Sequence, residues 1–465
     1  MKLRPLALAF SLAVAASPMA WAQMQLTSTA STGPALESLS TGGGRSLTTR
    51  GLASGLKLGE EAILHAGIFA DIGYDSNVFY ATSGTNSGLN NTSPVLHVNP
   101  RLEITNAERD GSIPSGTYYD LVGSVDFREY LSSDKQITQQ DAINPSLGGS
   151  AEFSSGQALS LSLSEAFSRF QQAPYQPGEP ITSDDNMASA GLTFAPGGGR
   201  LRVLLRYTNL IDKYEGTYDS GSYMGNEGVL DVGWRWLPKT SLYLQVAQGA
   251  ITYLNSNSGN SSSFPLRTLL GIRGLLTDKF GVNLAAGYSN AFYSSGNTPT
   301  GFGNVGIVAE VNYTLSLLSR AGLGYHHDFV NSPFLGGYYN MDAVYGVYQQ
   351  MVASRLMTYL YGRFENRRYG TAPASAIDPN TNAITTPAVD PSTGLPVTYD
   401  RVDNSVMFGA SVDYVIANVI ILGASYSLSL NRTLSADPVV PGVDIQSTKL
   451  DYTKHVLLFR VGAVY

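Results

Sequence analysis

From Ala62 onward, apolar and polar residues alternate along the chain in segments of about ten residues. In the first segment, Leu64, Ile68 and Ile72 hold one set of alternate positions. His65 and Asp71 hold the other set. Successive side chains of a strand point to opposite faces, so each segment predicts a strand with one apolar face. The length suits a tilted strand that crosses a bilayer, although a strand of a soluble sandwich would show the same pattern.

Eighteen such segments follow one another to the last residue. Their starts lie near residues 62, 95, 117, 143, 157, 185, 199, 225, 240, 265, 279, 302, 318, 338, 354, 402, 418 and 450. An even number of strands brings both ends of a barrel to the same side of the membrane. We therefore predict an all-β fold: a transmembrane antiparallel up-and-down β-barrel of about eighteen strands over residues 62–465.

The connections between segments alternate in length from the second strand to the last. Short turns are expected at 154–157, 196–198, 237–239, 277–279, 316–318, 352–354 and 416–418, and longer polar loops at 80–93, 255–263 and 294–301. Transmembrane barrels place short turns in the periplasm and long loops outside, whereas a soluble sandwich has no reason for this order. The longest loop, 370–400, either stays mobile outside the cell or folds into the mouth of the barrel.

Composition agrees with a barrel and excludes other classes of protein. Charged residues make up 14% of the chain, against about 25% in soluble proteins. No run of apolar residues after residue 22 is long enough for a transmembrane helix. The net charge is −7, and −9 once the first 22 residues with Lys2 and Arg4 are removed, which argues against nucleic-acid binding. Cysteine is absent, which excludes disulfides and a lipid-modified N-terminal cysteine.

The first 61 residues carry a targeting signal and a leader. Residues 1–22 combine a basic start, an apolar run at 6–16 and a small-residue cleavage site, which predicts a bacterial signal peptide. A membrane anchor would need a longer apolar span. Residues 23–61 are rich in Ser, Thr and Gly and predict a flexible periplasmic segment, with too few large apolar residues for a folded plug. These features predict the outer membrane as the location.

The last strand is expected to pair with the one near Ala62, so that no sheet edge is left in lipid. Its lipid face would carry Leu457, Phe459, Val461, Ala463 and Tyr465, with Arg460 on the lumen face. An aromatic end with apolar residues at alternate positions also resembles the signal read by the bacterial barrel-assembly machinery. That resemblance implies a recognition role for Leu457, Phe459, Val461 and Tyr465.

Aromatic residues near strand ends predict a girdle at the level of the lipid headgroups. The residues are Trp234, Trp236, Tyr207, Tyr288, Phe292, Tyr325 and Phe329. The alternative is that aromatic residues simply favour strands.

No arrangement in the sequence predicts catalysis, a cofactor or a metal site. The five histidines, His65, His97, His326, His327 and His455, are scattered over distant strands. The adjacent pair would point to opposite faces of one strand, and no serine lies in a nucleophile elbow. We therefore expect no enzyme; an outer-membrane hydrolase is an alternative that no motif supports.

The lumen face is expected to be polar and of mixed charge. By alternation it holds Arg101, Glu103, Asp120, Asp126, Arg128, Arg202, Arg206, Asp231, Arg235, Arg267, Arg273, Glu310, Arg320, Arg355, Arg363, Asp413 and Arg460, together with Asp71, Asp328 and Asp342. Inward aromatic rings that could stack on sugars are Tyr243, Tyr348, Tyr359 and Tyr361. The plainer alternative is that these charges pair with one another and stiffen the wall.

One short motif supports a family resemblance. After the first strand come Tyr74, Asp75, Ser76, Asn77, Val78 and Phe79. This stretch resembles the opening of the β-barrel family often called "beta-barrel porin 2". The resemblance implies an outer-membrane barrel of Gram-negative bacteria associated with export of exopolysaccharide or capsule, and it supplies no catalytic residues.

Three functions are consistent with these observations. The leading hypothesis is a hydrophilic channel that exports a secreted polysaccharide with periplasmic export proteins as partners. The second is a general or sugar-selective diffusion porin, and the third is a structural or adhesive surface barrel with a blocked lumen. In each case the partners include outer-membrane lipid and the barrel-assembly machinery, and nucleic acid is not expected.

Overall fold

The computed structural model describes residues 55–59, 62–81, 91–106, 116–173, 180–255, 262–293, 303–316, 318–332, 337–353, 355–373, 376–377, 384–385, 392, 398–434 and 451–465. The expected signal peptide at 1–22, most of the expected flexible segment at 23–61, the loop at 294–301 and most of the loop at 370–400 lie outside these residues.

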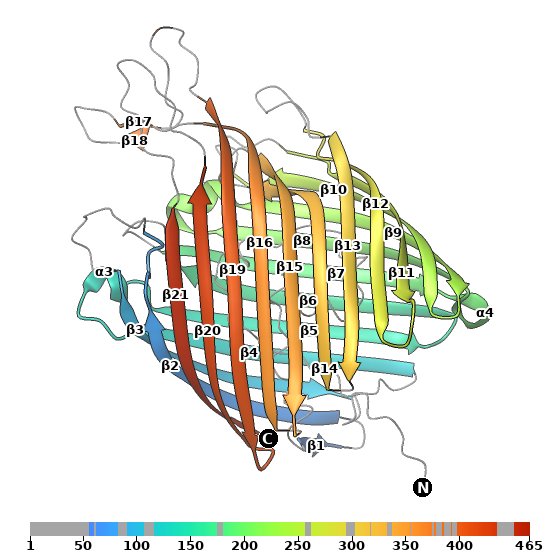
Figure 1. Cartoon of the computed structure of the whole chain (residues 1–465), viewed down its shortest axis with the longest axis horizontal. Coiled ribbons are helices and arrows are strands. Elements are labelled where there is room, and N and C mark those ends of the chain that lie inside the picture. Colours follow the sequence, from blue (N-terminus) through green and yellow to red (C-terminus); the bar gives the residue numbers. More distant parts are fainter. Residues whose placement is uncertain are drawn as a thin grey trace.

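Within the described residues, eighteen strands form one antiparallel sheet that closes because its last strand pairs with its first (Figure 1). The barrel strands are β2 (Ala62–Asp75), β3 (Ser93–Thr105), β4 (Gly116–Tyr130), β5 (Ala142–Ser155), β6 (Leu159–Gln172), β7 (Ile181–Phe194), β8 (Leu201–Tyr214), β9 (Tyr223–Leu237), β10 (Thr240–Tyr253), β11 (Leu266–Leu275), β12 (Phe280–Asn290), β13 (Gly303–Ser316), β14 (Ser319–Ser332), β15 (Gly337–Val352), β16 (Leu356–Pro373), β19 (Thr398–Ile416), β20 (Ile420–Thr433) and β21 (Tyr452–Val464). Each begins within a few residues of its predicted start, so the predicted barrel is confirmed.

Alternation explains which face of each strand points outward. Leu147, Leu270 and Leu323 lie on the outer surface with 64%, 66% and 60% of their area exposed. On β9 the exposed Leu230 is followed by Asp231, which is 1% exposed. An apolar outer surface with polar groups on the opposite face is stable only where lipid covers the outside. The outward face therefore forms the membrane-contacting belt, and the other face is called the inward face below.

The seam of the barrel lies between β2 and β21, whose pairing runs from Gly67 opposite Val464 to Asp75 opposite Val456. A further short strand, β1 (Leu56–Leu58), pairs antiparallel with residues 62–64 of β2. The opposite edge of β2 pairs with β3 along its length. β1 and β21 therefore share one edge of β2. This strand lies inside the segment 23–61, so residues 56–58 depart from the flexible structure expected there.

Seven connections confirm the short turns expected from the sequence, and their side of the barrel is called the turn rim. They join β5–β6, β7–β8, β9–β10, β11–β12, β13–β14, β15–β16 and β19–β20. The β7–β8 turn needs glycine, because Gly197, Gly198 and Gly199 have φ values of 61°, 75° and 74°. The strict alternation fails twice: 106–115 on the turn rim is about as long as 131–141 opposite, and 333–336 on the opposite rim is short.

The opposite rim, called the loop rim, carries the longer connections. Among the described residues it holds α3 (Lys135–Thr138) and η3 (Gly216–Gly221), and within the long loop β17 (Ala376–Ile377) pairs with β18 (Ile384–Thr385). The short α4 (Pro196–Gly199) belongs to the turn rim. No helix in the described residues is long and apolar enough to span a membrane. By the usual orientation of such barrels, the turn rim faces the periplasm.

Most of the expected aromatic girdle lies at the outer surface. Exposed aromatic side chains there are Trp234, Trp236, Tyr207, Tyr288 and Phe292, and Tyr325 shares the outward face of β14 with the exposed Leu323. Phe329 does not belong to this set. Its side chain is 3% exposed and packs with Ala291 and Tyr338 under the guanidinium of Arg267. The prediction was wrong there because residues near the loop rim are covered by neighbouring loop residues.

Candidate functional site: the inward face of the barrel

Among the described residues, the inward face is the large polar surface that the strand pattern sets apart from lipid. Of the charged residues expected to line the lumen, all but Arg355 and Asp342 lie on barrel strands at inward positions, alternate to the exposed apolar residues. Arg355 lies in the exposed β15–β16 turn, because the strand β16 starts one residue later. The site is therefore a wall rather than a single pocket.

A continuous set of contacts, called the central network, crosses the inward face from β9 to β15. Arg273 on β11 reaches over the ring of Tyr243 on β10, at 4.4 Å from its centroid. It makes two hydrogen bonds to the carboxylate of Asp231 on β9, at 2.8 and 2.5 Å. Fork-shaped pairs of this kind fix both direction and distance. The arginine thus spans three strands of the wall.

The network continues on the other side of Tyr243. Its hydroxyl donates to Asn283 Oδ1 on β12 at 3.0 Å, and Asn283 Nδ2 donates to Glu310 Oε2 on β13 at 2.9 Å. Glu310 also accepts a hydrogen bond from the hydroxyl of Tyr345 on β15, and His326 Nε2 on β14 lies 3.2 Å from its Oε1. Glu310 is 0% exposed. A buried carboxylate is stable only when its oxygens are satisfied in this way.

Two glycines make room for the rings of this network. A Cβ on Gly324 would lie 2.2 Å from Cζ of Tyr345, and one on Gly271 would lie 2.8 Å from Cε1 of Tyr243. Each ring therefore lies close to the backbone of a neighbouring strand. The glycines are needed for this close approach rather than for backbone flexibility.

A second group of charges lies toward the loop rim on β16 and β19. Glu365 accepts hydrogen bonds from Arg363 and from Arg367 Nε, the latter at 2.6 Å. The next pair, Arg401 and Asp403, is joined at 2.7 Å, with both side chains 3% exposed. Both carboxylates of this group are therefore paired within the wall, and Glu365 is shared by two arginines.

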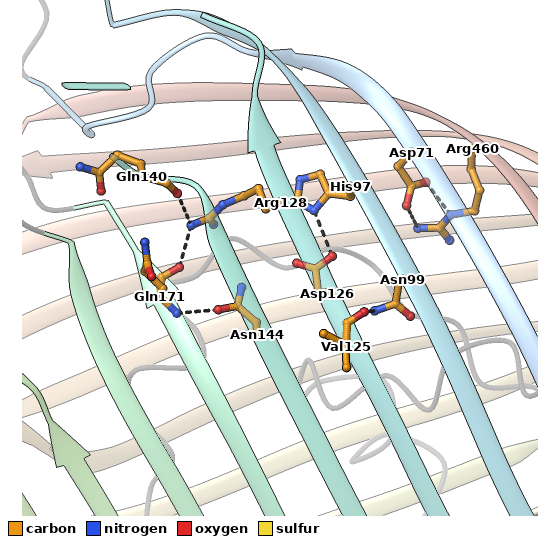
Figure 2. Close-up of polar contacts among 10 residues, drawn as sticks. All are labelled: Asp71, His97, Asn99, Val125, Asp126, Arg128, Gln140, Asn144, Gln171 and Arg460. Atoms are coloured by element: carbon orange, nitrogen blue, oxygen red, sulfur yellow. Dashed lines mark hydrogen bonds and ion pairs between the residues drawn. The ribbon is translucent and has the colours of Figure 1, made fainter. Parts of the chain in front are cut away.

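Figure 2 shows the polar contacts of the strands near the seam. Arg128 Nη2 donates to the carbonyl oxygens of Gln140 and Gln171, at 3.1 and 2.8 Å. His97 Nδ1 lies 3.2 Å from Asp126 Oδ1 on the adjacent strand. These contacts tie β3 to β4, and β4 to the segments after it, so they mainly brace the wall.

Other predicted lumen charges fall into three sets. Arg101 pairs with Glu103 at 3.7 Å, Arg267 pairs with Asp328 at 2.7 Å, and Arg460 pairs with Asp71 at 2.7 Å. By contrast, the described residues offer no ion-pair partner to Arg202, Arg235, Arg320 or Arg355, which lie at or near the turn rim. The third set lies at inward positions on β8, β4 and β19 and consists of Arg206, Asp120 and Asp413.

The prediction of sugar-stacking rings needs correction. Tyr348 was expected on the inward face, but it lies on the outward face of β15, beside the exposed Leu360 of β16. Tyr243 and Tyr359 are inward but only 1% and 3% exposed, because Arg273 covers the first and an apolar cluster with Tyr345 covers the second. Tyr361 packs against the same cluster. Tyr243 and Tyr359 therefore offer no open ring face to a sugar, and Tyr348 lies on the face toward lipid.

Asp342 was also expected inward and lies outward. It alternates with the buried Ala343 and Tyr345, and its carboxylate is 2.7 Å from His327 Nδ1. The neighbouring His326 points inward to Glu310. The two adjacent histidines thus lie on opposite faces, as predicted. The described residues contain no group of three or more His, Cys, Asp or Glu side chains that could hold a metal ion.

The motif behind the family resemblance forms a clasp across the seam, called the seam clasp below. The carboxylate of Asp75 lies 2.8 Å from Lys454 Nζ of the last strand. Ser76 exchanges hydrogen bonds with the backbone of His455. Asn77 donates to Thr453 O at 3.1 Å. Sequence reasoning did not foresee this role, since it depends on the register between the two ends of the chain.

The outer belt, the closed sheet and the short turns together have the architecture of a bacterial outer-membrane barrel. The protein is an outer-membrane β-barrel. No family model and no curated protein matches the chain. The resemblance to beta-barrel porin 2 therefore stays a prediction.

Several solved structures are similar in outline. OccAB3 of Acinetobacter baumannii shares 10% identity, with 87% of this chain and 99% of that chain covered and a TM-score of 0.42. OccK9 of Pseudomonas aeruginosa gives the same four values. The siderophore receptor PirA of Pseudomonas aeruginosa shares 8% identity, with 86% and 80% covered and a TM-score of 0.39. At such scores the likeness carries no argument about what this barrel transports.

Proposed function

We propose that this barrel is a channel that exports a secreted polysaccharide across the outer membrane. The observation that supports it is the chemistry of the inward face. The inward faces of β4 to β7 present half-buried serine hydroxyls, at Ser124, Ser146, Ser164 and Ser189, which can exchange hydrogen bonds with sugar hydroxyls.

Charge pairing favours a polyhydroxylated solute over a small ion. Arg273 is held by Asp231, Arg460 by Asp71, and Glu365 by two arginines. Most inward charges are therefore paired with one another within the wall. Hydrogen bonding is then the main interaction that the wall can make with a solute. A diffusion porin for sugars would use the same chemistry, so the two transport functions must be separated by experiment.

Conductance in planar bilayers tests the channel itself. The full chain should carry current, and Ser164→Trp, which places a large ring on the inward face, should reduce it several-fold. Leu163→Trp changes the neighbouring outward residue, which is 42% exposed, and should leave the current unchanged. If the wild type carries no current, and none appears after deletion of residues 374–397, both transport functions fail and a structural barrel is favoured.

A deletion strain separates export from diffusion. Export predicts that surface polysaccharide is lost while uptake of small sugars is unchanged. Complementation with the Leu163→Trp variant should restore the polysaccharide, and the Ser164→Trp variant should restore it poorly. Normal surface polysaccharide in the deletion strain, with reduced sugar uptake, would establish the diffusion porin instead.

A further inference from the structure

Three arginines gather at the turn rim where β8 and β9 meet, and they are called the arginine cluster below. Arg200 ends the β7–β8 turn, and Arg202 and Arg235 lie at inward positions on β8 and β9. The backbone N–H of Arg235 donates to Arg200 O at 2.7 Å. Opposite Arg202 stands Gly233, two residues before Arg235. Side chains at such diagonal positions lie within reach of one another.

The cluster is open and uncompensated. All three side chains are exposed, and within the described residues no carboxylate comes within ion-pair distance of them. The nearest inward carboxylate on these strands, Asp231, already holds Arg273 through both oxygens. The acidic residue of the neighbouring turn, Asp278, is joined to Lys239. Like charges on paired strands are unfavourable, so this arrangement calls for an anion.

Other features of the rim point the same way. Arg320 lies inward near the start of β14, and Arg355 is exposed in the β15–β16 turn, both without an ion-pair partner among the described residues. Nearer the loop rim on the same wall, β7 and β8 carry inward carboxylates instead, at Asp185 and Asp212. Along β7–β9 the inward charges thus change from basic at the turn rim to acidic at the loop rim.

The chemistry and the position of the arginine cluster limit which ligand can bind there. Guanidinium groups bind carboxylate or phosphate groups through two parallel hydrogen bonds. Trp234 and Trp236, between and beside the cluster residues on β9, point outward at 44% and 57% exposure, so lipid contacts the other face of this strand. A ligand of Arg202 and Arg235 therefore reaches them from the aqueous side, and the periplasmic mouth is the nearer opening of the barrel. It must also be hydrophilic enough to continue along the polar wall.

We propose that the arginine cluster is a binding site for an acidic polysaccharide, one that carries carboxylate or phosphate groups, at the periplasmic entrance of the barrel. The inference rests on the proposed function and narrows its substrate from any secreted polysaccharide to an anionic one. The cluster captures negatively charged sugar units, and the hydrogen-bonding wall beyond it contacts their hydroxyls.

Binding to the full-length barrel in lipid nanodiscs tests this site. The probe is an oligomer of galacturonate, with a neutral glucose oligomer of the same length for comparison. We expect the uronate oligomer to bind and the neutral one to bind at least ten-fold more weakly. Arg202→Gln combined with Arg235→Gln should weaken uronate binding at least ten-fold. Because both side chains are exposed and unpaired, this variant should keep the circular dichroism and gel mobility of the wild type.

A matched control removes the same charge elsewhere. Lys213→Gln combined with Lys279→Gln takes two exposed cations from the loop end of β8 and from the β11–β12 turn, and should leave uronate binding unchanged. Equal binding by the cluster variant and the wild type, or equal losses in both double variants, would overturn the proposal. Nanodiscs with and without phosphatidylglycerol form a further arm. If the anionic lipid alone displaces the uronate, the cluster is a lipid headgroup site and the proposal is wrong.

The outcome is separable from that of the proposed function. If the barrel binds uronate through the cluster but carries no current, the anion site is supported and the channel function is refuted. If the barrel carries current but shows no preference for uronate, the channel function is supported and the anion site is refuted. Reversal potentials in a salt gradient add a second readout, since the cluster variant should be less anion-selective than the control variant.

Discussion

Removal of Lys454 offers the sharpest test of the seam clasp. Lys454 and Asp75 are both nearly buried, with side chains 6% and 5% exposed, and their charged atoms are 2.8 Å apart. Lys454→Met keeps the length of the side chain and leaves the carboxylate of Asp75 without its cation. Breaking one partner of a buried ion pair costs about 3–5 kcal/mol.

The contacts that remain place the effect within that range. Asp75 would keep two donors, the backbone N–H of Asn77 at 3.0 Å and the hydroxyl of Tyr130 at 3.3 Å. We therefore expect Lys454→Met to lower the free energy of unfolding by about 3 kcal/mol. Asp75→Leu should cost more, about 4–5 kcal/mol, because among the described residues the ammonium would keep just the ring of Tyr80, 4.1 Å away.

Urea unfolding of the barrel in lipid vesicles, followed by tryptophan fluorescence, measures these differences. The double variant Asp75→Leu with Lys454→Met should cost clearly less than the sum of the two single variants, since neither charge is then left alone. Arg273→Met breaks the pair with Asp231 away from the seam and serves as the comparison. A loss below about 1 kcal/mol for Lys454→Met, the value typical of surface pairs, would refute the reasoning.

Three further predictions test the wall and its two faces. Gly324→Val should cost about 1–3 kcal/mol of unfolding free energy because its side chain would displace the ring of Tyr345, whereas Gly346→Ala, with its nearest atom 3.8 Å away, should be nearly neutral in the same urea titration. Leu270→Arg puts a charge on the lipid face and should cost about 2–4 kcal/mol; normal amounts of folded variant in outer-membrane fractions would contradict the assignment of that face. Single cysteines in this cysteine-free chain report orientation, so Arg202→Cys should react with a membrane-impermeant maleimide and Tyr348→Cys only with a lipid-soluble one; labelling of Tyr348→Cys by the impermeant reagent would return that residue to the lumen.

The barrel itself was predictable from the sequence because the alternation of apolar and polar residues within each strand shows which side chains point outward and which point inward. The alternation around Leu270 or Asp231 can be recognised without knowing the neighbouring strands. Because lipid covers one side of the sheet, the two faces of each strand differ strongly in polarity. The starts of the strands and the seven short turns followed from the same local pattern. The two departures from alternating loop length, at 106–115 and 333–336, had no local signal.

The contacts of the wall were not predictable, because they depend on register. Asn283 and Tyr345 are inward by alternation, yet their joint contact with Glu310 requires the four consecutive strands β12 to β15 in a fixed offset. Tyr348 was misplaced because its strand has aromatic residues on both faces, so that composition could not say which face was which. The seam clasp joins residues from opposite ends of the barrel sequence, and no periodicity within one segment reports such a contact.

The shared edge of β2 has a consequence for how large the barrel can be. The diameter and the tilt of the strands follow from the stagger that accumulates around the sheet. β1 already occupies residues 62–64 of that edge, and the pairing of β21 begins beside it, with Tyr465 bonded to Ala66. The last strand cannot slide further along β2 without displacing β1. This local hairpin of a few residues therefore limits in one direction the register of β21 on β2, on which the stagger of the closed barrel depends.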